Sequence, residues 1–329
     1  MSSVDATPPR LAVILGRADE MRAVVYLRML DGEVSLAGTL RGPRCRHAAT
    51  LQTTASLRML PPPEAGAVGA AIAEAILVEP GFWSPELPNR YELELCLTDR
   101  SGRTTNHSQM VGVCRLGHRN GAFRLDGRRY VPRAITLGDG HRLQAAEAAA
   151  VVAKARDASV ALWTETPSEA VCEAADAEGV LLIADLPAEL TGEQAGREVA
   201  RLAVHPSVGF VAVKPSHLGS VVAWRSVRGT MQLGLQLDGG IAPPSAATPA
   251  DCPEGIDFLV VVVLEAGLPH ETWRRPAPLP VVIRRPLPRG AGGVTMQEQR
   301  RGCERLQADM AAWLAGTATR PWEPAGYAV

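Results

Sequence analysis

Carboxylates near the ends of predicted strands are the first residues in this 329-residue chain that could do chemistry. The acidic candidates are Asp139, Asp185 and Glu189. A pair of carboxyl groups held close together serves general acid–base catalysis, or one of the two attacks as a nucleophile. The alternative interpretation is that these three groups are solvated carboxylates at strand ends.

Basic side chains form the second group of candidates, near predicted strands in the second half of the chain. They are Lys214, Arg274, Arg275, Arg284, Arg285 and Arg289. If these strands belong to one barrel, several of the cations converge at one face, where they would bind a carboxylate, a phosphate or an acidic patch on another protein. The alternative is a scatter of solvated arginines, because only two of the 34 basic residues are lysines.

Other kinds of site are not expected. The six cysteines lie far apart in the sequence and no histidine stands at metal-ligand spacing, so we expect no metal, no cofactor and reduced thiols. A disulfide between Cys96 and Cys114 is the alternative for that pair. The 34 basic and 35 acidic residues nearly cancel, which argues against nucleic acid as a partner.

The N-terminus has no basic segment followed by an apolar one, so the sequence predicts no secretory signal. The longest apolar runs, such as residues 258–264, are too short to span a bilayer. We therefore expect a cytoplasmic protein without a transmembrane segment, and its attachment to a membrane complex stays open.

Short apolar or β-branched segments separated by turn residues fill residues 10–117, after an N-terminus (1–9) expected to be disordered or extended. About seven strands at this spacing are typical of a two-sheet sandwich. Residues 67–78 are the ambiguous segment, because AVGAAIAEAILV also fits a helix.

From residue 118 to 329, strand-length apolar runs alternate with helical or irregular stretches, which favours parallel βα units. The eight runs are 130–136, 159–163, 180–185, 208–213, 231–237, 257–264, 279–285 and 325–329, and the expected helices are 143–156, 168–177 and 297–314. Eight such strands predict a (β/α)₈ barrel. Because residues 238–255 have no helical period and the last run reaches the end of the chain, we expect a reduced barrel ending at strand eight.

Four colinear motifs resemble the β-galactosidase/β-glucuronidase family of glycoside hydrolases. They are FWSPELPNRY at 82–91, GAFRLDGRR at 121–129, EAADAEGVLL at 173–182 and HPSV at 205–208, which are similar to the family's lWSPenPnlY, dGxFxLNGkp, lCDexGllV and nHPSv. The resemblance covers residues 80–329. It implies an immunoglobulin-like β-sandwich followed by a TIM barrel.

The resemblance also implies where the family's catalytic groups would fall. Retaining glycosidases use two carboxyl groups about 5–5.5 Å apart, and in this family they stand at the ends of strands four and seven. The acid/base position falls on Ser216 and the nucleophile position on Arg285, while the family's arginine after strand two falls on or near Trp163. Since neither Ser216 nor Arg285 supplies the required carboxyl group, the resemblance implies a pseudoenzyme.

The preferred prediction from the sequence is therefore a non-catalytic pseudo-glycosidase that binds or scaffolds other protein subunits in a larger assembly. The alternative is a divergent glycoside hydrolase, or a carbohydrate-binding protein, with a rebuilt site at the barrel mouth. In that alternative Asp185 acts together with Asp139.

Overall fold

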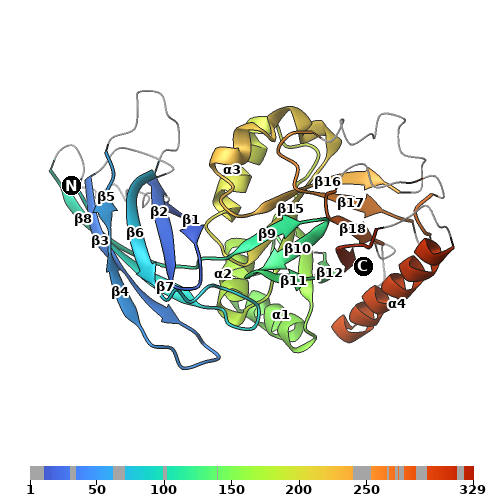
Figure 1. Ribbon diagram of the computed structural model, residues 1–329, viewed down its shortest axis with the longest axis horizontal. Coiled ribbons are helices and arrows are strands. Elements are labelled where there is room, and N and C mark those ends of the chain that lie inside the picture. The colour runs from blue at the N-terminus through green and yellow to red at the C-terminus, as the bar shows by residue number, and fades with distance from the viewer. Residues whose placement is uncertain are drawn as a thin grey trace.

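A computed structural model gives the fold. It describes residues 11–29, 35–61, 71–98, 102–138, 140–239, 253–264, 267–270, 273, 278–286, 295–316 and 322–329. Figure 1 shows β-sheets on the left and a closed barrel on the right, with one long helix at the far edge of the barrel. The predicted extended segment 1–9 and most of the predicted loop 238–255 lie outside the described residues.

Two antiparallel sheets of four strands form the N-terminal third. One has the order β1 (Leu11–Ala18), β2 (Arg22–Met29), β6 (Ala71–Val78), β5 (Arg58–Met59), and the other β4 (Thr53–Ser56), β3 (Ser35–Arg44), β7 (Arg90–Thr98), β8 (Thr104–Val111). Buried side chains from both sheets belong to one apolar cluster, so the sheets pack face to face as a sandwich.

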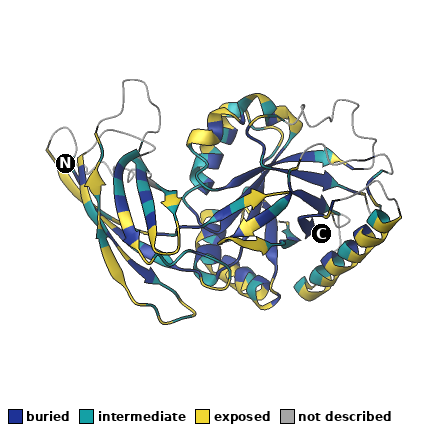
Figure 2. Cartoon of the chain, in the orientation of Figure 1, coloured by how far each residue is buried: buried dark blue, intermediate teal, exposed yellow. Residues whose placement is uncertain are grey.

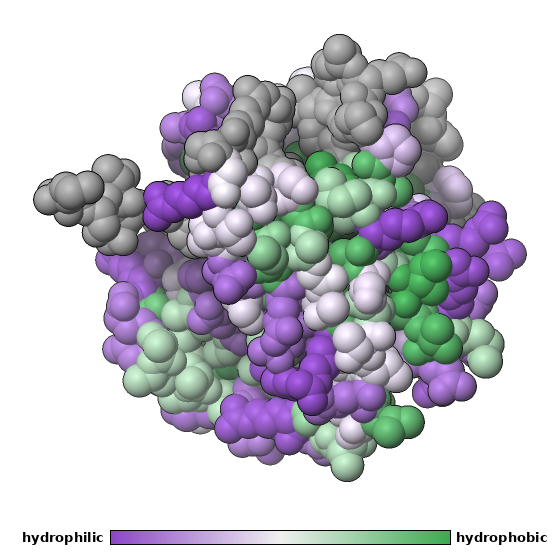
Figure 3. Space-filling view, turned by 90° about the vertical axis from the view of Figure 1, so that its left-hand side faces the viewer, coloured by the Kyte–Doolittle hydropathy of each residue, from purple (hydrophilic) through white to green (hydrophobic). Residues whose placement is uncertain are grey.

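The ambiguous segment 67–78 is a strand where it is described. Along β6, Ala73, Ala75 and Leu77 are buried and alternate with more exposed residues, which is the period-two pattern of a strand with one face in a core. Figure 2 shows the same alternation of buried and exposed residues across the sandwich. The sandwich end that faces the viewer in Figure 3 carries interspersed hydrophobic and hydrophilic side chains.

A small antiparallel sheet, not predicted from the sequence, follows the sandwich. It consists of β9 (Leu116–Arg119), β10 (Ala122–Leu125) and β11 (Arg128–Tyr130). Its two connections are Asn120-Gly121 and Asp126-Gly127, and all four of these residues have positive φ (48° to 76°). Such residues favour the tight two-residue turns that join antiparallel strands.

Eight parallel strands close into a barrel, and each of them overlaps one of the eight predicted runs. They are β12 (Arg133–Leu137), β13 (Ala161–Glu165), β14 (Leu182–Asp185), β15 (Val208–Val213), β16 (Gln232–Asp238), β17 (Phe258–Val262), β18 (Val281–Arg284) and β19 (Gly326–Ala328), which pairs back onto β12. The runs are continuous because barrel strands are buried on both faces.

The described helices are α1 (Ala145–Asp157), α2 (Glu169–Glu178), α3 (Gly192–Leu202) and α4 (Met296–Ala315), together with the 3₁₀ turns η1 (Pro215–Ser220) and η2 (Ala223–Ser226). Helices α1, α2 and α4 confirm the predicted segments. Helix α3 was not predicted, although Thr191 and Gln194 form a capping box at its start.

The barrel interior is closed at its N-terminal end by aromatic rings. Phe123 of β10 packs edge-on against Phe210 and Phe258, with ring centroids 4.7 Å and 5.4 Å away. Trp83, from the sandwich side, is fully buried in the same cluster and donates its indole N–H to the Asp176 carbonyl oxygen at 3.0 Å. The sandwich and the barrel therefore share a buried contact.

Candidate functional site

The C-terminal ends of the barrel strands carry a polar layer, here called the mouth. Along β14, Leu182 and Ala184 pack outward against the helices, whereas Ile183 packs inside the barrel. Because side chains alternate along a strand, Asp185 also points inward. It stands at the C-terminal end of the barrel, where enzymes of this architecture place their active sites.

Asp185 contacts side chains from three other strands and from Lys214, the residue after β15. Its Oδ2 atom accepts from Arg284 NH1 at 2.9 Å and from Trp163 Nε1 at 3.4 Å. Its Oδ1 atom lies 2.9 Å from Lys214 Nζ and accepts from Gln236 Nε2 at 2.6 Å. These donors fix the orientation of the Asp185 carboxyl group.

The two cations are themselves held in place. The guanidinium of Arg284 lies 4.4 Å from the centre of the Trp163 ring, a cation–π contact. Burial lowers the pKa of Arg284, and the charge of Asp185 opposes this shift. Lys214 follows β15 directly, donates Nζ to Gln236 Oε1 at 2.9 Å, and its backbone N–H donates to His217 Nδ1 at 3.4 Å.

This arrangement has two positive charges for one negative charge. The side chain of Lys214 is 29% exposed, against 13% for Asp185 and 14% for Arg284, so solvent reaches the positive side of the cluster. Lys214 and Arg284 are thus the two predicted cations that the structure brings together. Chemically, they can bind an incoming carboxylate in competition with Asp185.

The other predicted site residues lie elsewhere. Arg285 points away from the mouth: its NH1 atom pairs with Asp309 Oδ2 on α4 at 2.9 Å, because it is one residue out of phase with Arg284. Ser216 is exposed in η1, and Glu189 is exposed in the loop after β14. Four further candidates lie outside the described residues, namely Asp139, Arg274, Arg275 and Arg289.

Glu165 is a mouth residue that the sequence analysis missed. It ends β13, is in register with Asp185 on the neighbouring strand, and shares the inward direction of Trp163 by alternation. The next residue, Thr166, has φ = 34°, a strained value for a β-branched residue, and donates its N–H to the Asp185 carbonyl at 3.3 Å. Glu165 could have been identified from the sequence, because it lies two residues after Trp163 and therefore on the same face of the predicted strand.

Within the described ranges, no three His, Cys, Asp or Glu side chains are placed to hold a metal ion. No described helix is both long and apolar enough to cross a bilayer. The described cysteines, Cys45, Cys96, Cys114, Cys172 and Cys303, are free thiols.

Comparison with known proteins places the fold. No family model matches the chain, and no curated protein sequence matches it. Among solved structures, the β-glucuronidase of Ruminococcus gnavus in complex with D-glucuronic acid is 11% identical, with a TM-score of 0.65 over 97% of this chain and 60% of the other. The β-glucuronidases of Dictyoglomus thermophilum and Parabacteroides merdae are each 12% identical, with TM-scores of 0.62 and 0.60 over 97% of this chain. The chain spans 61% and 46% of their lengths.

These neighbours correct one prediction. The prediction that the chain is not an enzyme is contradicted, because the structures that it matches over 97% of its length are enzymes, although they share only 11% to 12% of its sequence. The predicted combination of a β-sandwich and a parallel eight-stranded barrel is confirmed. The chain has a glycoside-hydrolase-like fold.

Proposed function

We propose that the mouth is the rebuilt site of a divergent glycoside hydrolase that acts on an acidic sugar. The observation that carries this proposal is the convergence of four side chains, from in or just after four other barrel strands, on Asp185 at the C-terminal end of the barrel. In this proposal Lys214 and Arg284 bind the sugar's carboxylate. Asp185 and Glu165 form the pair of carboxyl groups.

An acidic sugar fits the charge of the mouth better than a neutral one. Lys214 and Arg284 share the single carboxylate of Asp185, so the two cations have donors left for a second carboxylate. A uronate carboxylate would accept charge-assisted hydrogen bonds from Lys214 and Arg284. Such bonds are about twice as strong as hydrogen bonds between neutral groups. Because the substrate carboxylate would compete with Asp185 for Lys214 and Arg284, one oxygen of Asp185 would become free to face the substrate.

The two carboxyl groups have different environments, which suits different roles. Asp185 is largely buried among hydrogen-bond donors and is the candidate nucleophile, whereas Glu165 is exposed and is the candidate acid/base. Neighbouring strands lie about 4.8 Å apart, close to the separation of about 5–5.5 Å between carboxyl groups in retaining glycosidases. In the first step, Glu165 would protonate the leaving oxygen while Asp185 attacks the anomeric carbon and forms a glycosyl ester. In the second step, Glu165 would take a proton from a water molecule, which would hydrolyse that ester and release Asp185.

The proposal includes the loss of the family's original groups. Its acid/base and nucleophile positions are assigned to Ser216 and Arg285, so the chemistry would have moved to β13 and β14 within a reduced barrel that follows an immunoglobulin-like sandwich. A scaffolding role beside other protein subunits, and a cytoplasmic location, stay predictions.

A panel of aryl β-glycosides tests the proposal, together with calorimetric binding of glucuronate and glucose. We expect turnover of an aryl β-glucuronide, tighter binding of glucuronate than of glucose, and at least a 100-fold loss of turnover in Glu165→Gln with glucuronate binding retained. Glu189→Gln is the matched control, because it makes the same substitution at an exposed glutamate in the loop after β14. Its turnover and its glucuronate binding should equal those of the wild type. Asp185→Asn, if it folds, should also lose turnover.

Two results would overturn the proposal. Binding of glucuronate without turnover of any glycoside would reject Glu165 and Asp185 as reacting groups. Equal or absent binding of glucuronate and glucose would reject the mouth as an acidic-sugar site.

A further inference from the structure

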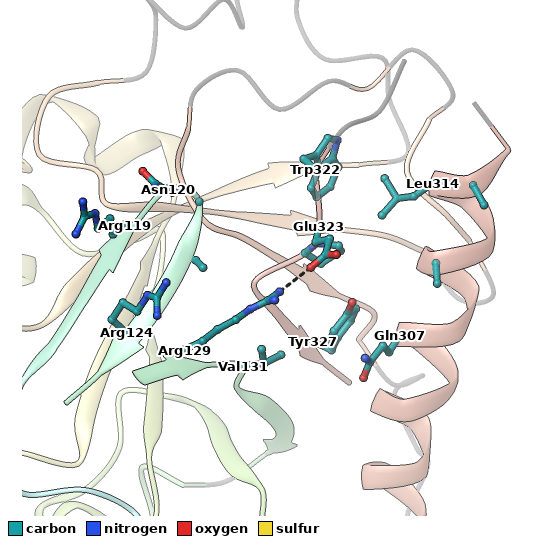
Figure 4. Close-up of a pocket in the computed structure, with 15 residues that line it drawn as sticks. Arg119, Asn120, Arg124, Arg129, Val131, Gln307, Leu314, Trp322, Glu323 and Tyr327 are labelled. Carbon is teal, nitrogen blue, oxygen red and sulfur yellow. Dashed lines mark hydrogen bonds and ion pairs between the residues drawn. The ribbon is translucent and has the colours of Figure 1, made fainter. Parts of the chain in front are cut away.

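A second candidate site lies at the opposite end of the barrel from the mouth. A groove of about 880 Å³ opens between the small sheet β9–β11 and helix α4. Val131, just before β12, and residues 322–324, just before β19, lie along it, so it stands at the N-terminal ends of the strands. Figure 4 shows arginines projecting from the small sheet on one side and α4 on the other.

The wall formed by the small sheet is basic because of the strand register. Arg124 of β10 lies directly opposite Arg129 of β11, and Arg119 lies on the same face by alternation along β9. The residues between them on this face are Gly117 and Ala122, which add almost no bulk. Three guanidinium groups are therefore presented together.

These charges are poorly balanced within the protein. Arg129 pairs with Glu323 at 2.7 Å, and both side chains are more than half exposed. In the described part of the chain, no acidic side chain pairs with Arg119 or Arg124; Arg124 NH1 makes one long contact, 3.5 Å, to the Gly127 carbonyl. Like charges directly opposite each other on paired strands destabilise a sheet. A cost of this kind is typical of a functional surface.

The facing wall differs in character. It is made by Ala311 and Leu314 of α4 with Trp322 and Tyr327. Trp322 is 8% exposed, and its indole N–H has no acceptor among the described residues. The groove therefore offers positive charge on one side and an apolar wall on the other.

We infer that this groove binds a phosphate monoester with a ring-shaped body, such as a sugar phosphate. A phosphate dianion matches two uncompensated guanidinium groups, each of which can make paired hydrogen bonds to its oxygens. The ring lies against the apolar wall, where Ala311 is exposed and Leu314 half-buried, and a volume of 880 Å³ accommodates a ligand of this size. The site is independent of the proposed sugar site at the mouth.

Thermal-shift and calorimetric titrations with glucose 6-phosphate, inorganic phosphate and glucose test this inference. We expect glucose 6-phosphate to bind tightest, inorganic phosphate more weakly, and glucose without measurable affinity. Arg124→Gln should lower the affinity for glucose 6-phosphate at least tenfold. Because it removes a like-charge pair, it should leave the unliganded protein equally or more stable. That combination of changes is not expected of a purely structural arginine.

Arg128→Gln is the matched control, since Arg128 is an exposed arginine of the same hairpin whose side chain leaves the sheet on the other face. It should retain wild-type affinity, as should Glu165→Gln at the mouth, which separates this site from the proposed function. Equal losses in Arg124→Gln and Arg128→Gln would overturn the inference as non-specific charge attraction. Inorganic phosphate binding as tightly as glucose 6-phosphate would overturn the role of the apolar wall.

Discussion

His205 Nδ1 lies 2.8 Å from Asp176 Oδ2, and its Nε2 lies 3.1 Å from Glu169 Oε1, so one imidazole joins helix α2 to the turn before β15. Asp176 also accepts the backbone N–H of Ser207 at 3.0 Å, while its carbonyl accepts from Trp83 of the sandwich side. Burial disfavours the charged imidazole, but the two carboxylates outweigh this and raise the pKa of His205 to about 10.

Stability should therefore fall as the solution becomes alkaline. The unfolded-state pKa of histidine is about 6.5, so the folded state holds a proton that the unfolded state loses above this pH. The contribution is fully present below about pH 6.5 and is lost as pH rises through about 10, by a few kcal/mol in total. Urea unfolding between pH 6 and 10 measures it. His205→Gln should flatten this slope, and an unchanged slope in the variant would assign the alkaline loss to another group.

At the mouth, Asp185 and Arg284 should be strongly coupled. Asp185→Asn leaves Arg284 and Lys214 as neighbouring cations without their shared carboxylate, and removing one partner of a largely buried pair costs about 3–5 kcal/mol. Arg284→Met alone leaves Asp185 with Lys214 and should cost less. A double-mutant cycle in chemical denaturation checks this, and we expect non-additivity above about 0.5 kcal/mol. Additive losses would show that the pair does not contribute as a unit.

Gly234 should not tolerate even a methyl group. A Cβ atom there would lie 2.2 Å from Phe258 Cζ, inside the closed barrel, whereas at Gly219 nothing lies within 4 Å of a Cβ. Overpacking of a core typically costs about 1–3 kcal/mol. Gly234→Ala should therefore lower the unfolding free energy by about this amount, with Gly219→Ala as the matched control near zero. Equal melting temperatures for both variants would contradict the tight barrel packing.

Alkylation should separate the cysteines by burial. Burial raises the pKa of the Cys114 and Cys303 thiols to about 12, and that of Cys172 well above its usual value. Cys96 is exposed and Cys45 half-buried. Among these five cysteines, mass spectrometry after brief treatment with iodoacetamide at pH 8 should find label first on Cys96 and Cys45. Early labelling of Cys114 would contradict its buried position. If Cys96 and Cys114 were labelled only after treatment with a reductant, the result would indicate a disulfide between them.

Much of the barrel could be read from local sequence. The runs 208–213 and 257–264 contain β15 and β17 because strands buried on both faces must be apolar throughout. Helix α4 was visible as a long segment with helical character. Helix α3 was missed because few of its side chains are apolar: Ala195, Val199 and Leu202 are its buried residues. The small sheet was missed because its strands are three or four residues long and rich in arginine.

The candidate site depended on distances that no local pattern contains. The local sequence pattern was enough to place Asp185, Lys214 and Arg284 at or just after the ends of barrel strands. That Arg284 turns inward and Arg285 outward is visible in the folded barrel alone, since a shift of one residue reverses the face of a strand. The folded barrel likewise places Glu165 beside Asp185, because register between strands is fixed by how the closed barrel packs and not by either segment alone.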